Sequence, residues 1–507
     1  MKKISIIISL SIMCISSVMA VETYYVSKTG SDTPPYDTWA TASSDISTVL
    51  SKSTSFNDVV VIVGDGTYQL SLSLLCEWGV VLKSANGKAS TILEDNGAAS
   101  GGGQLLYING ASIVDGFTIK NGKVILLSFS SLLNCDVIGS PDRGITSEYS
   151  TISNCVVKSN SSDLDGAGIQ SIGGIIVDCI IEDNVTTGVG GGISTYGNPM
   201  NTIQNCIIRN NTATGNGGGI HIGVARDYMT VKNCILYSNT STTSSGGGVY
   251  LDTYGNIVNC TIVDNTSVSG GGLSCTNGGR VINNIIYNNT ASSNPNWNNN
   301  GTGMVYSNNV TTPSIGVNCI ISAPTFVSAG LRDYRLTVDS AGIDNGLDMS
   351  SIITDDYYGN PRPLDGNNDD VTVMDIGSFE YLNIISDSDH DTMLDGWEID
   401  NNLNVLIDDS GDDPDNDGQD NATEYVLDND PSVIDEPFIT NLSKSMELSW
   451  DTSANRYYSI YQTSDLSIND WEGVPGKTNM VGTGNSMSVV MDNSTDKMFY
   501  RVSVHVQ

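Results

Sequence analysis

The sequence is poor in basic, histidine and aromatic residues. It has 22 Lys and Arg against 57 Asp and Glu, which gives a net charge of −35 over 507 residues. Such an acidic balance argues against nucleic acid as a partner, because a phosphate-binding surface needs clustered basic side chains. Disorder is not indicated, since 39% of the residues are hydrophobic and can build a core.

Long hydrophobic runs are also lacking, except within the first twenty residues. There Lys2 and Lys3 precede an apolar run that ends in small residues at Ala20. This order predicts a secretory signal peptide over residues 1–20, cleaved after about Ala20. No later stretch approaches the ~18 consecutive apolar residues of a membrane-spanning helix, so no transmembrane segment is expected in the mature chain. We therefore expect a protein that is secreted or held on the outer cell surface.

Helical spacing of apolar residues is absent, and an internal repeat of Cys, Asn and Gly takes its place. Six cysteines recur every 20 to 28 residues, Asn284 takes the next place in phase, and Asn stands five residues after most of these positions. The cysteines are Cys135, Cys155, Cys179, Cys206, Cys234 and Cys260, and the asparagines are Asn160, Asn184, Asn211, Asn239, Asn265 and Asn289. Glycine runs that end in an aliphatic residue, such as 217–220, precede several of the cysteines. Repeats with this period indicate a solenoid.

Short β-branched runs around each cysteine, bounded by turn residues, predict strands, so the solenoid should be a parallel β-helix. Its coils would rise about 4.8 Å each. The asparagines would then form an inward ladder of stacked amides. Stacked cysteines lie within disulfide reach, but parallel Cβ vectors suit the bond poorly, so buried free thiols are expected. A metal ladder is disfavoured because no histidine accompanies the stack.

These repeats resemble those of right-handed parallel β-helix proteins, particularly the polymorphic outer-membrane-protein repeat. Residues 24–94 resemble the segment that begins many such helices. The runs DYRLTVDSAGIDNG (333–346), YYGNPRP (357–363) and DIGSFEY (375–381) resemble the choice-of-anchor module that closes them. The resemblance implies a right-handed β-helix with its N-terminal cap over residues 21–320 and a C-terminal cap over 321–382. No membrane barrel follows, so the autotransporter role of polymorphic membrane proteins is not carried over.

Two acidic loops follow. Residues 387–398 and 413–424 both place carboxylates at positions 1, 3 and 5 of a 12-residue loop that ends in Glu. This is the spacing of an EF-hand-type loop, in which hard oxygens wrap Ca²⁺. The predicted ligands are Asp387, Asp389, Asp391, the Met393 carbonyl, Asp395 and Glu398 in the first loop, and Asp413, Asp415, Asp417, the Gln419 carbonyl, Asn421 and Glu424 in the second. Thr392 stands where the motif wants Gly, as at Gly418, so the first site should be the weaker.

The loops resemble the acidic calcium repeats of thrombospondin-type and dockerin-like modules. The alternative is a solvated acidic linker, which is what most charge runs are. Residues 363–443 hold 23 acidic residues and no basic one, so most of the excess charge lies here. We expect a calcium-binding segment over 383–436, and Ca²⁺ rather than Mg²⁺, which prefers tighter octahedral sites.

Alternating polar and apolar residues return over 437–507 and predict a small antiparallel β-sandwich. Its aromatic residues could form a sugar-stacking face or simply a core; they are Trp450, Tyr457, Tyr461, Trp471 and Tyr500. The expected fold class is therefore all-β: a right-handed parallel β-helix, an acidic calcium-binding linker and a C-terminal sandwich.

Catalysis is the open question, because right-handed β-helices include polysaccharide lyases and glycoside hydrolases. A hydrolase needs paired carboxylates at a controlled separation, and a lyase needs a basic residue. The candidates are Asp163, Asp165, His221 and Arg226, with Asp227 and Asp252 nearby. The paired-Asp and Gly-His-Gly signatures of polygalacturonases are absent, and so is a pectate-lyase-like cluster of Asp with a following Arg.

The sequence thus favours an exported calcium-binding β-helix protein with a structural, adhesive or glycan-contacting role. A polysaccharide lyase or glycoside hydrolase is the alternative. The expected partner is a polysaccharide or a cell-surface glycan, not nucleic acid, and the oligomeric state stays open.

Overall fold

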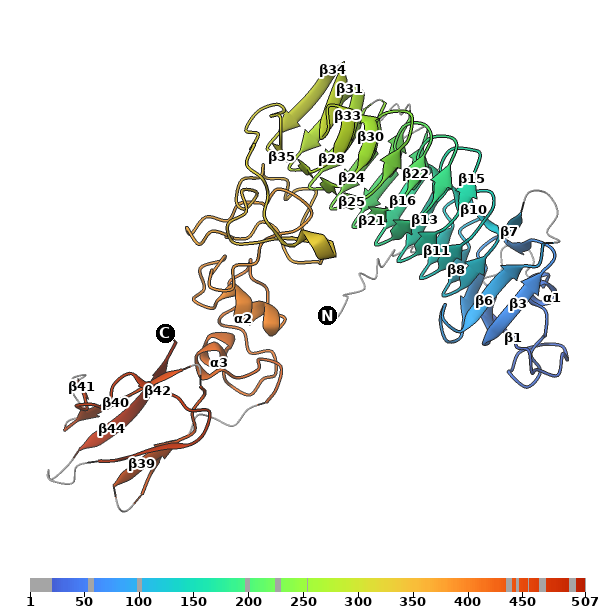
Figure 1. Ribbon diagram of the computed structural model, residues 1–507. Coiled ribbons are helices and arrows are strands. Elements are labelled where there is room, and N and C mark those ends of the chain that lie inside the picture. Colours follow the sequence, from blue (N-terminus) through green and yellow to red (C-terminus); the bar gives the residue numbers. More distant parts are fainter. Residues whose placement is uncertain are drawn as a thin grey trace. The chain divides into compact units, whose positions relative to one another are not determined.

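The computed structural model describes residues 21–52, 59–97, 103–196, 201–223, 229–252, 254–434, 440–443, 446–454, 456–464, 471–491 and 498–506. The chain divides into two compact units (Figure 1). The first comprises Met1–Pro363 and Val373–Tyr381, and the second comprises Leu364–Thr372 and Leu382–Gln507. The predicted signal peptide, residues 1–20, lies outside the described residues.

The first unit is a parallel β-solenoid, as predicted, and the strands of its coils form three sheets. The 11-stranded sheet contains β3 (Gly66–Leu70), β6 (Thr91–Asp95), β9 (Thr118–Lys120), β12 (Asp136–Ile138), β14 (Val156–Lys158), β17 (Ile180–Glu182), β21 (Ile207–Arg209), β25 (Ile235–Tyr237), β29 (Thr261–Val263), β32 (Ile285–Tyr287) and β35 (Val310–Thr311). The 6-stranded sheet contains β15 (Ser161–Ser162), β18 (Val185–Thr186), β22 (Thr212–Ala213), β26 (Thr240–Ser241), β30 (Thr266–Ser269) and β33 (Thr290–Ser293).

The 18-stranded sheet runs as two neighbouring rows that merge in the long strands β13, β16, β31 and β34. Its strands are β1 (Glu22–Val26), β2 (Val59–Val63), β4 (Leu74–Cys76), β5 (Val81–Ser84), β7 (Gln104–Ile108), β8 (Ile113–Asp115), β10 (Lys123–Leu126), β11 (Ser131–Leu133), β13 (Ile145–Ser153), β16 (Ile169–Val177), β19 (Ile193–Thr195), β20 (Asn201–Gln204), β23 (Ile220–Ile222), β24 (Met229–Lys232), β27 (Val249–Leu251), β28 (Gly255–Val258), β31 (Leu273–Ile282) and β34 (Trp297–Ser307). One short helix, α1 (Ile46–Leu50), lies near the start of the solenoid.

The repeated residues lie at the corners between these sheets. Each repeat cysteine follows a strand of the 18-stranded sheet, and each repeat asparagine follows a strand of the 11-stranded sheet. The residue before the cysteine, for example Asn154 or Asp178, has a positive φ of 52° or 55°. Asn and Asp tolerate this left-handed conformation, which explains why they recur at that position.

The asparagine column is a continuous hydrogen-bond ladder, as predicted. The Nδ2 of Asn184 donates to Asn211 Oδ1 at 2.9 Å, and Asn211 Nδ2 donates to Asn239 Oδ1 at 3.0 Å. Each Oδ1 also accepts from a backbone N–H of the neighbouring coil, at 3.1 Å from Asn184 N to Asn211. These side chains are fully buried, so the ladder satisfies polar groups that water cannot reach.

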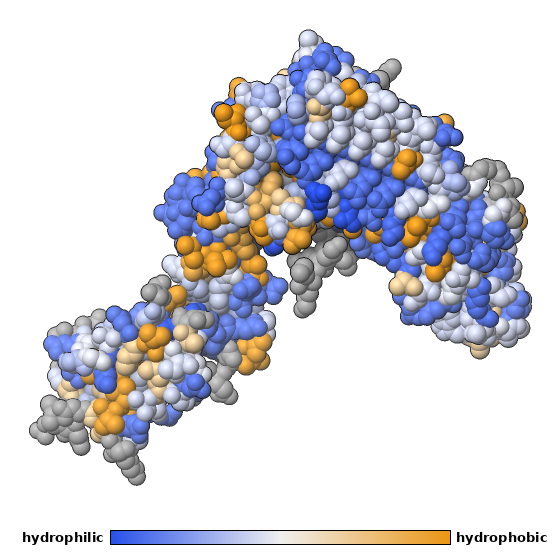
Figure 2. Space-filling model, viewed as in Figure 1, coloured by the Kyte–Doolittle hydropathy of each residue, from blue (hydrophilic) through white to orange (hydrophobic). Residues whose placement is uncertain are grey.

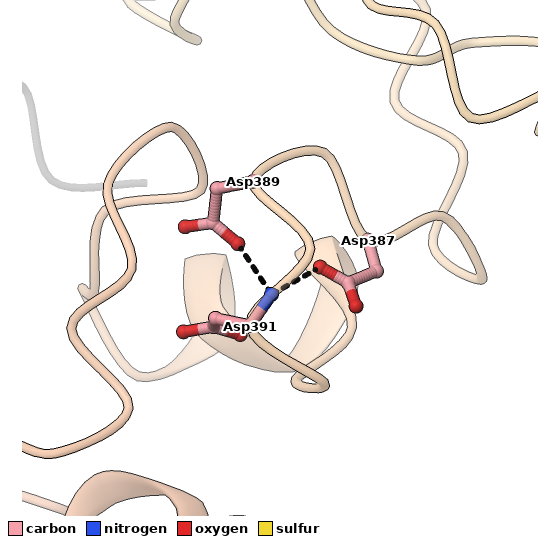
Figure 3. A group of neighbouring side chains, drawn as sticks. All are labelled: Asp387, Asp389 and Asp391. Atoms are coloured by element: carbon pink, nitrogen blue, oxygen red, sulfur yellow. Dashed lines mark hydrogen bonds between the residues drawn. The ribbon is translucent and has the colours of Figure 1, made fainter.

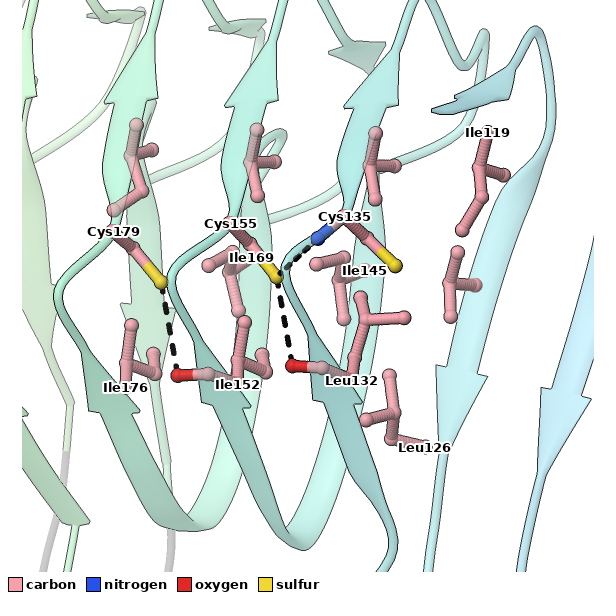
Figure 4. Close-up of a cluster of buried hydrophobic side chains, with 14 of the residues drawn as sticks. Ile119, Leu126, Leu132, Cys135, Ile145, Ile152, Cys155, Ile169, Ile176 and Cys179 are labelled. Atoms are coloured by element: carbon pink, nitrogen blue, oxygen red, sulfur yellow. Dashed lines mark hydrogen bonds between the residues drawn. The ribbon is translucent and has the colours of Figure 1, made fainter. Parts of the chain in front are cut away.

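The cysteine column lines the core beside stacked isoleucines (Figure 4). All cysteines of the described residues are free, and Cys135, Cys155 and Cys179 are at most 1% exposed. Their sulfurs contact neighbouring backbone: Cys155 Sγ donates to Leu132 O at 3.5 Å. The expectation of buried free thiols is confirmed for these residues, and burial raises the pKa of each of these three thiols.

The segment after the last coil packs along the solenoid's side. Val317 and Ile320 pair with the last coil, and β36 (Phe326–Ser328), the 3₁₀ turn η1 (Ala329–Leu331) and β37 (Asp333–Leu336) follow. Arg362 and Glu380 form a fully buried ion pair at 2.7 Å, and Arg362 also donates to Asn233 of the solenoid at 3.3 Å. This segment therefore holds several coils through buried polar contacts.

Among its described residues, the second unit contains two short helices and two antiparallel sheets. The helices are α2 (Asp395–Asp400) and α3 (Asn421–Leu427). One sheet is β38 (Thr440–Leu442), β39 (Glu447–Trp450) and β43 (Met487–Val490), and the other is β40 (Tyr457–Thr463), β41 (Glu472–Gly473), β42 (Met480–Val481) and β44 (Phe499–His505). Trp450, Ile460 and Val489 from both sheets share one buried cluster. Among the described residues, no helix is long and apolar enough to cross a membrane.

Candidate functional site

The first acidic loop gathers three carboxylates around its turn (Figure 3). Oxygens of Asp387, Asp389 and Asp391 all lie within 4.8 Å of one another. The backbone N–H of Asp391 donates to Asp387 Oδ1 at 3.1 Å and to Asp389 Oδ1 at 3.2 Å, so the loop backbone orients the carboxylates. Thr392 has φ 81°, the strained conformation for which the sequence motif uses glycine.

The second loop repeats this geometry. Oxygens of Asp413, Asp415 and Asp417 group within 4.8 Å, and Gly418 occupies the turn with φ 96°. The N–H of Gly418 donates to Asp413 Oδ2 at 3.0 Å, as the N–H of Thr392 donates to Asp387 Oδ2 at 2.9 Å. The two loops therefore share one backbone design, and the first carries the strained non-glycine turn.

The helices α2 and α3 begin at position 9 of their loops and carry the final glutamates. Glu398 and Glu424 are both fully buried. Neither carboxylate oxygen of Glu398 has a hydrogen-bond partner among the described residues. Burial and the nearby Asp389 and Asp391 carboxylates raise the pKa of Glu398 to about 9. Buried carboxylates that face one another are relieved either by protonation or by a bound cation, and an all-oxygen set fits Ca²⁺.

The side chains at loop position 9, Asp395 and Asn421, form hydrogen bonds with other protein groups. Both oxygens of Asp395 accept from Ser388, from its N–H at 2.8 Å and its hydroxyl at 2.7 Å. Asn421 donates through Nδ2 to the backbone carbonyl of Asp409 at 2.8 Å. Asp409 in turn lies within 4.8 Å of the ligand atoms of Asp391 and Glu398. Sequence reasoning missed Asp409 because it lies outside both loops; its only signal is the acidic run around it.

The remaining predicted ligands lie within the same loops. Met393 and Asn421 are buried, and Asn421 Oδ1 has no hydrogen-bond partner among the described residues. Gln419 donates through its backbone N–H to Asp417 Oδ1 at 2.8 Å and through Nε2 to Asp417 Oδ2 at 3.0 Å. The acidic side chains of this segment could hold a metal ion.

Two of the four catalytic candidates lie near each other on the solenoid. Asp165 accepts a hydrogen bond from the Tyr196 hydroxyl, and the Tyr196 ring lies 5.9 Å from the His221 ring. His221 stacks on Tyr250 at 5.5 Å, and burial lowers its pKa to about 4. Asp163 is exposed, and Arg226 and Asp227 lie outside the described residues.

Sequence reasoning missed Tyr196 and Tyr250, although the repeat phase contains a signal for Tyr250. Ser194, His221 and Tyr250 each follow the aliphatic residue that ends a glycine run, and they pair in register on β19, β23 and β27. Burial and Asp165 raise the pKa of Tyr196 to about 12. At neutral pH the group therefore combines a protonated phenol and an uncharged imidazole beside Asp165.

Of the aromatic residues of the last module, Trp450 is buried and Tyr461 and Trp471 are half-buried. Trp450 is 2% exposed and packs near Tyr458, so it belongs to the core. Tyr461 and Trp471 flank the guanidinium of Arg501, at 5.1 and 4.7 Å from their ring centres. On the face shown in Figure 2, hydrophobic residues of the whole chain lie in small, scattered groups.

Comparisons with known proteins identify no family. No family model matches the sequence, and no curated protein matches it. The structure is similar to the crystal structure of pectate lyase Pel9A, with a TM-score of 0.47 and 15% identity over 71% of this chain and 96% of that chain. It is also similar to ORF18 of Geobacillus virus E2, with a TM-score of 0.35 and 14% identity over 52% and 58% of the two chains. At these scores and identities neither likeness bears on the activity of this chain.

Proposed function

We propose that this protein is an exported β-solenoid whose acidic second unit binds Ca²⁺ and whose role is structural, adhesive or glycan-contacting. One observation carries the calcium claim. Glu398 is fully buried, both of its carboxylate oxygens lack hydrogen-bond partners among the described residues, and it groups with Asp391 and Asp409. Leaving such charges unpaired would cost several kcal/mol each, whereas a bound divalent cation satisfies them.

The calcium sites support the terminal sheets through direct contacts. Arg456 donates to the backbone carbonyls of Tyr425 and Val426 on α3, at 2.9 Å for Val426, and its guanidinium lies 5.5 Å from the Tyr425 ring centre. Ordering the second loop therefore orders a helix that the terminal sheets hold. The function that follows is a calcium-stabilised module, filled at the 10⁻⁴–10⁻³ M affinities typical of extracellular sites.

Calcium titration of the full chain tests this claim. We expect two ions per chain by isothermal titration calorimetry, and neither Mg²⁺ nor Na⁺ at equal ionic strength should reproduce the heat. A glycan array run with calcium and with chelator tests the contacting role. Absence of any calcium-specific binding would leave the acidic segment as a spacer and refute the proposal.

A second candidate function is polysaccharide cleavage, and the grouping of Asp165, Tyr196 and His221 favours it. The uncharged imidazole could accept a proton, and Tyr196, held by Asp165, could donate one. Incubation with uronic-acid and neutral polysaccharides, followed by reducing-end and unsaturated-product assays, tests it. Tyr196→Phe should abolish any product release, whereas Tyr149→Phe, which changes an exposed tyrosine of β13, should not. Wild-type protein that releases no product refutes this candidate.

A further inference from the structure

A carboxylate that belongs to neither acidic loop lies at the first of them. Asp409 stands between the loops, and a carboxylate oxygen of it lies within 4.8 Å of ligand atoms of Asp391 and Glu398. Glu398 is fully buried, and Asp391 is 6% exposed. Asp391 Oδ2 and both Glu398 oxygens have no hydrogen-bond partner among the described residues, so they are available to a cation.

The first loop has a place for this extra oxygen. In an EF-hand-type loop the residue at position 9 contributes to the ion's coordination, often through water. Here that residue is Asp395, and Ser388 occupies both of its oxygens. Asp409 is a further carboxylate at this loop: its Oδ2 accepts from the Asn404 N–H at 3.2 Å, and one of its oxygens lies within 4.8 Å of ligand atoms of Asp391 and Glu398.

We propose that Asp409 is a direct ligand of the Ca²⁺ ion in the first loop, and that it couples this site to the second loop. The proposal rests on the calcium function stated above and adds a ligand and a cooperative link to it. Carboxylate charge count tunes calcium affinity, so this extra ligand offsets the strain at Thr392.

The link to the second loop runs through Asn421. Its Nδ2 donates to the Asp409 carbonyl at 2.8 Å and lies 3.4 Å from Asp409 Oδ1, and its N–H donates to Asp412 O at 2.8 Å. Asn421 is itself at position 9 of the second loop. The rings of Trp397 on α2 and Tyr425 on α3 pack 5.0 Å apart. An ion that orders Asn421 therefore orients Asp409 toward the first ion, and by linkage the reverse also holds.

Calcium titration of full-length variants tests the proposal. Asp409→Ala should weaken the first site about tenfold and remove positive cooperativity. Asp408→Ala removes the same charge from the neighbouring position, and it should leave both sites within about twofold of wild type. Asp389→Ala deletes a proposed ligand of the first loop, so the step of the titration curve that it weakens is the one that belongs to the first site.

The outcomes separate this proposal from the calcium function. If Asp408→Ala and Asp409→Ala weaken calcium binding equally, Asp409 acts only through its charge and is not a direct ligand. If Asp409→Ala binds calcium like the wild type, Asp409 is not part of the site. Asp415→Ala in the second loop should weaken the first site about fivefold; an unchanged first site refutes the coupling. Wild-type protein that binds no calcium refutes the proposed function instead. If Asp409→Ala fails to fold, Asp409→Asn keeps a neutral oxygen ligand and should weaken the first site by a smaller factor.

Discussion

Removing one rung of the asparagine ladder should destabilise the solenoid far more than removing an exposed asparagine. Asn211 lies mid-ladder and is fully buried. Its side chain donates to Ile181 O at 2.9 Å and Asn239 Oδ1 at 3.0 Å, and it accepts from Asn184 N at 3.1 Å and Asn184 Nδ2 at 2.9 Å. Asn211→Ala deletes these four hydrogen bonds and leaves the buried N–H of Asn184 unpaired.

The magnitude follows from these contacts. Each intramolecular hydrogen bond contributes about 0.5–1.5 kcal/mol net, and an unpaired buried donor costs about 1–3 kcal/mol. We expect Asn211→Ala to lower the free energy of unfolding by about 4 kcal/mol. Asn86→Ala is the matched control, because among the described residues the side chain of exposed Asn86 donates only to exposed Asp65, at 3.0 Å. Its effect should stay below about 0.5 kcal/mol.

Urea denaturation followed by far-ultraviolet circular dichroism measures both variants, with calcium present to hold the second unit folded. Each coil of a solenoid contacts only its neighbours, so a substitution in the middle of the solenoid can also split the unfolding transition into two steps. Either a lowered midpoint or a split transition supports the ladder's role. Equal midpoints for Asn211→Ala and Asn86→Ala would refute the reasoning.

Three further predictions test other parts of the account. Burial lowers the pKa of His221 from an ordinary 6.5 to about 4 in the folded protein, so the unfolded chain binds a proton more readily than the folded chain does. The resulting contribution to the free energy of unfolding, about 3 kcal/mol, is present above pH 6.5 and is lost as pH falls toward 4. The pH dependence of thermal unfolding over this window should therefore flatten in His221→Asn, and an unchanged slope would contradict the burial argument. A thiol-reactive probe should label half-buried Cys319 before the buried column of Cys135–Cys260 in the folded protein, read by peptide mass spectrometry; early labelling of Cys206 would contradict the packed core. Asp413→Ala with Glu424→Ala should lower the second unit's melting temperature in calcium to its value in chelator, and a wild-type melting temperature would remove the second loop from the site.

Features that repeat along the chain could be predicted from the sequence. The spacing of Cys155, Cys179 and Cys206 reports the length of one coil, so the solenoid, the buried thiols and the asparagine ladder follow from local patterns. The carboxylate groups of the two loops also follow, because the predicted ligands of each loop lie within twelve consecutive residues. The strained turn at Thr392 is one such feature.

Features that depend on distant residues could not be predicted in this way. Asp409 approaches Glu398 from outside the loop, and the pairing of Asp395 with Ser388 depends on how α2 packs. The Asp165–Tyr196 hydrogen bond joins residues 31 positions apart, and only the register of the coils brings them together. The packing of residues 340–363 and 373–381 against the side of the solenoid likewise rests on single contacts such as Arg362 with Asn233.

Differential scanning calorimetry of the full chain, with calcium and with chelator, tests the central claim most directly. The second unit holds the carboxylate groups of both loops, whereas no such cluster lies among the described residues of the solenoid. We expect chelator to lower the melting temperature of the second unit by about 10 °C or more, because each site adds about 2.7 kcal/mol when calcium is at about 100 times its dissociation constant, while the solenoid transition stays in place. A calorimetric trace in which neither transition responds to calcium would contradict it.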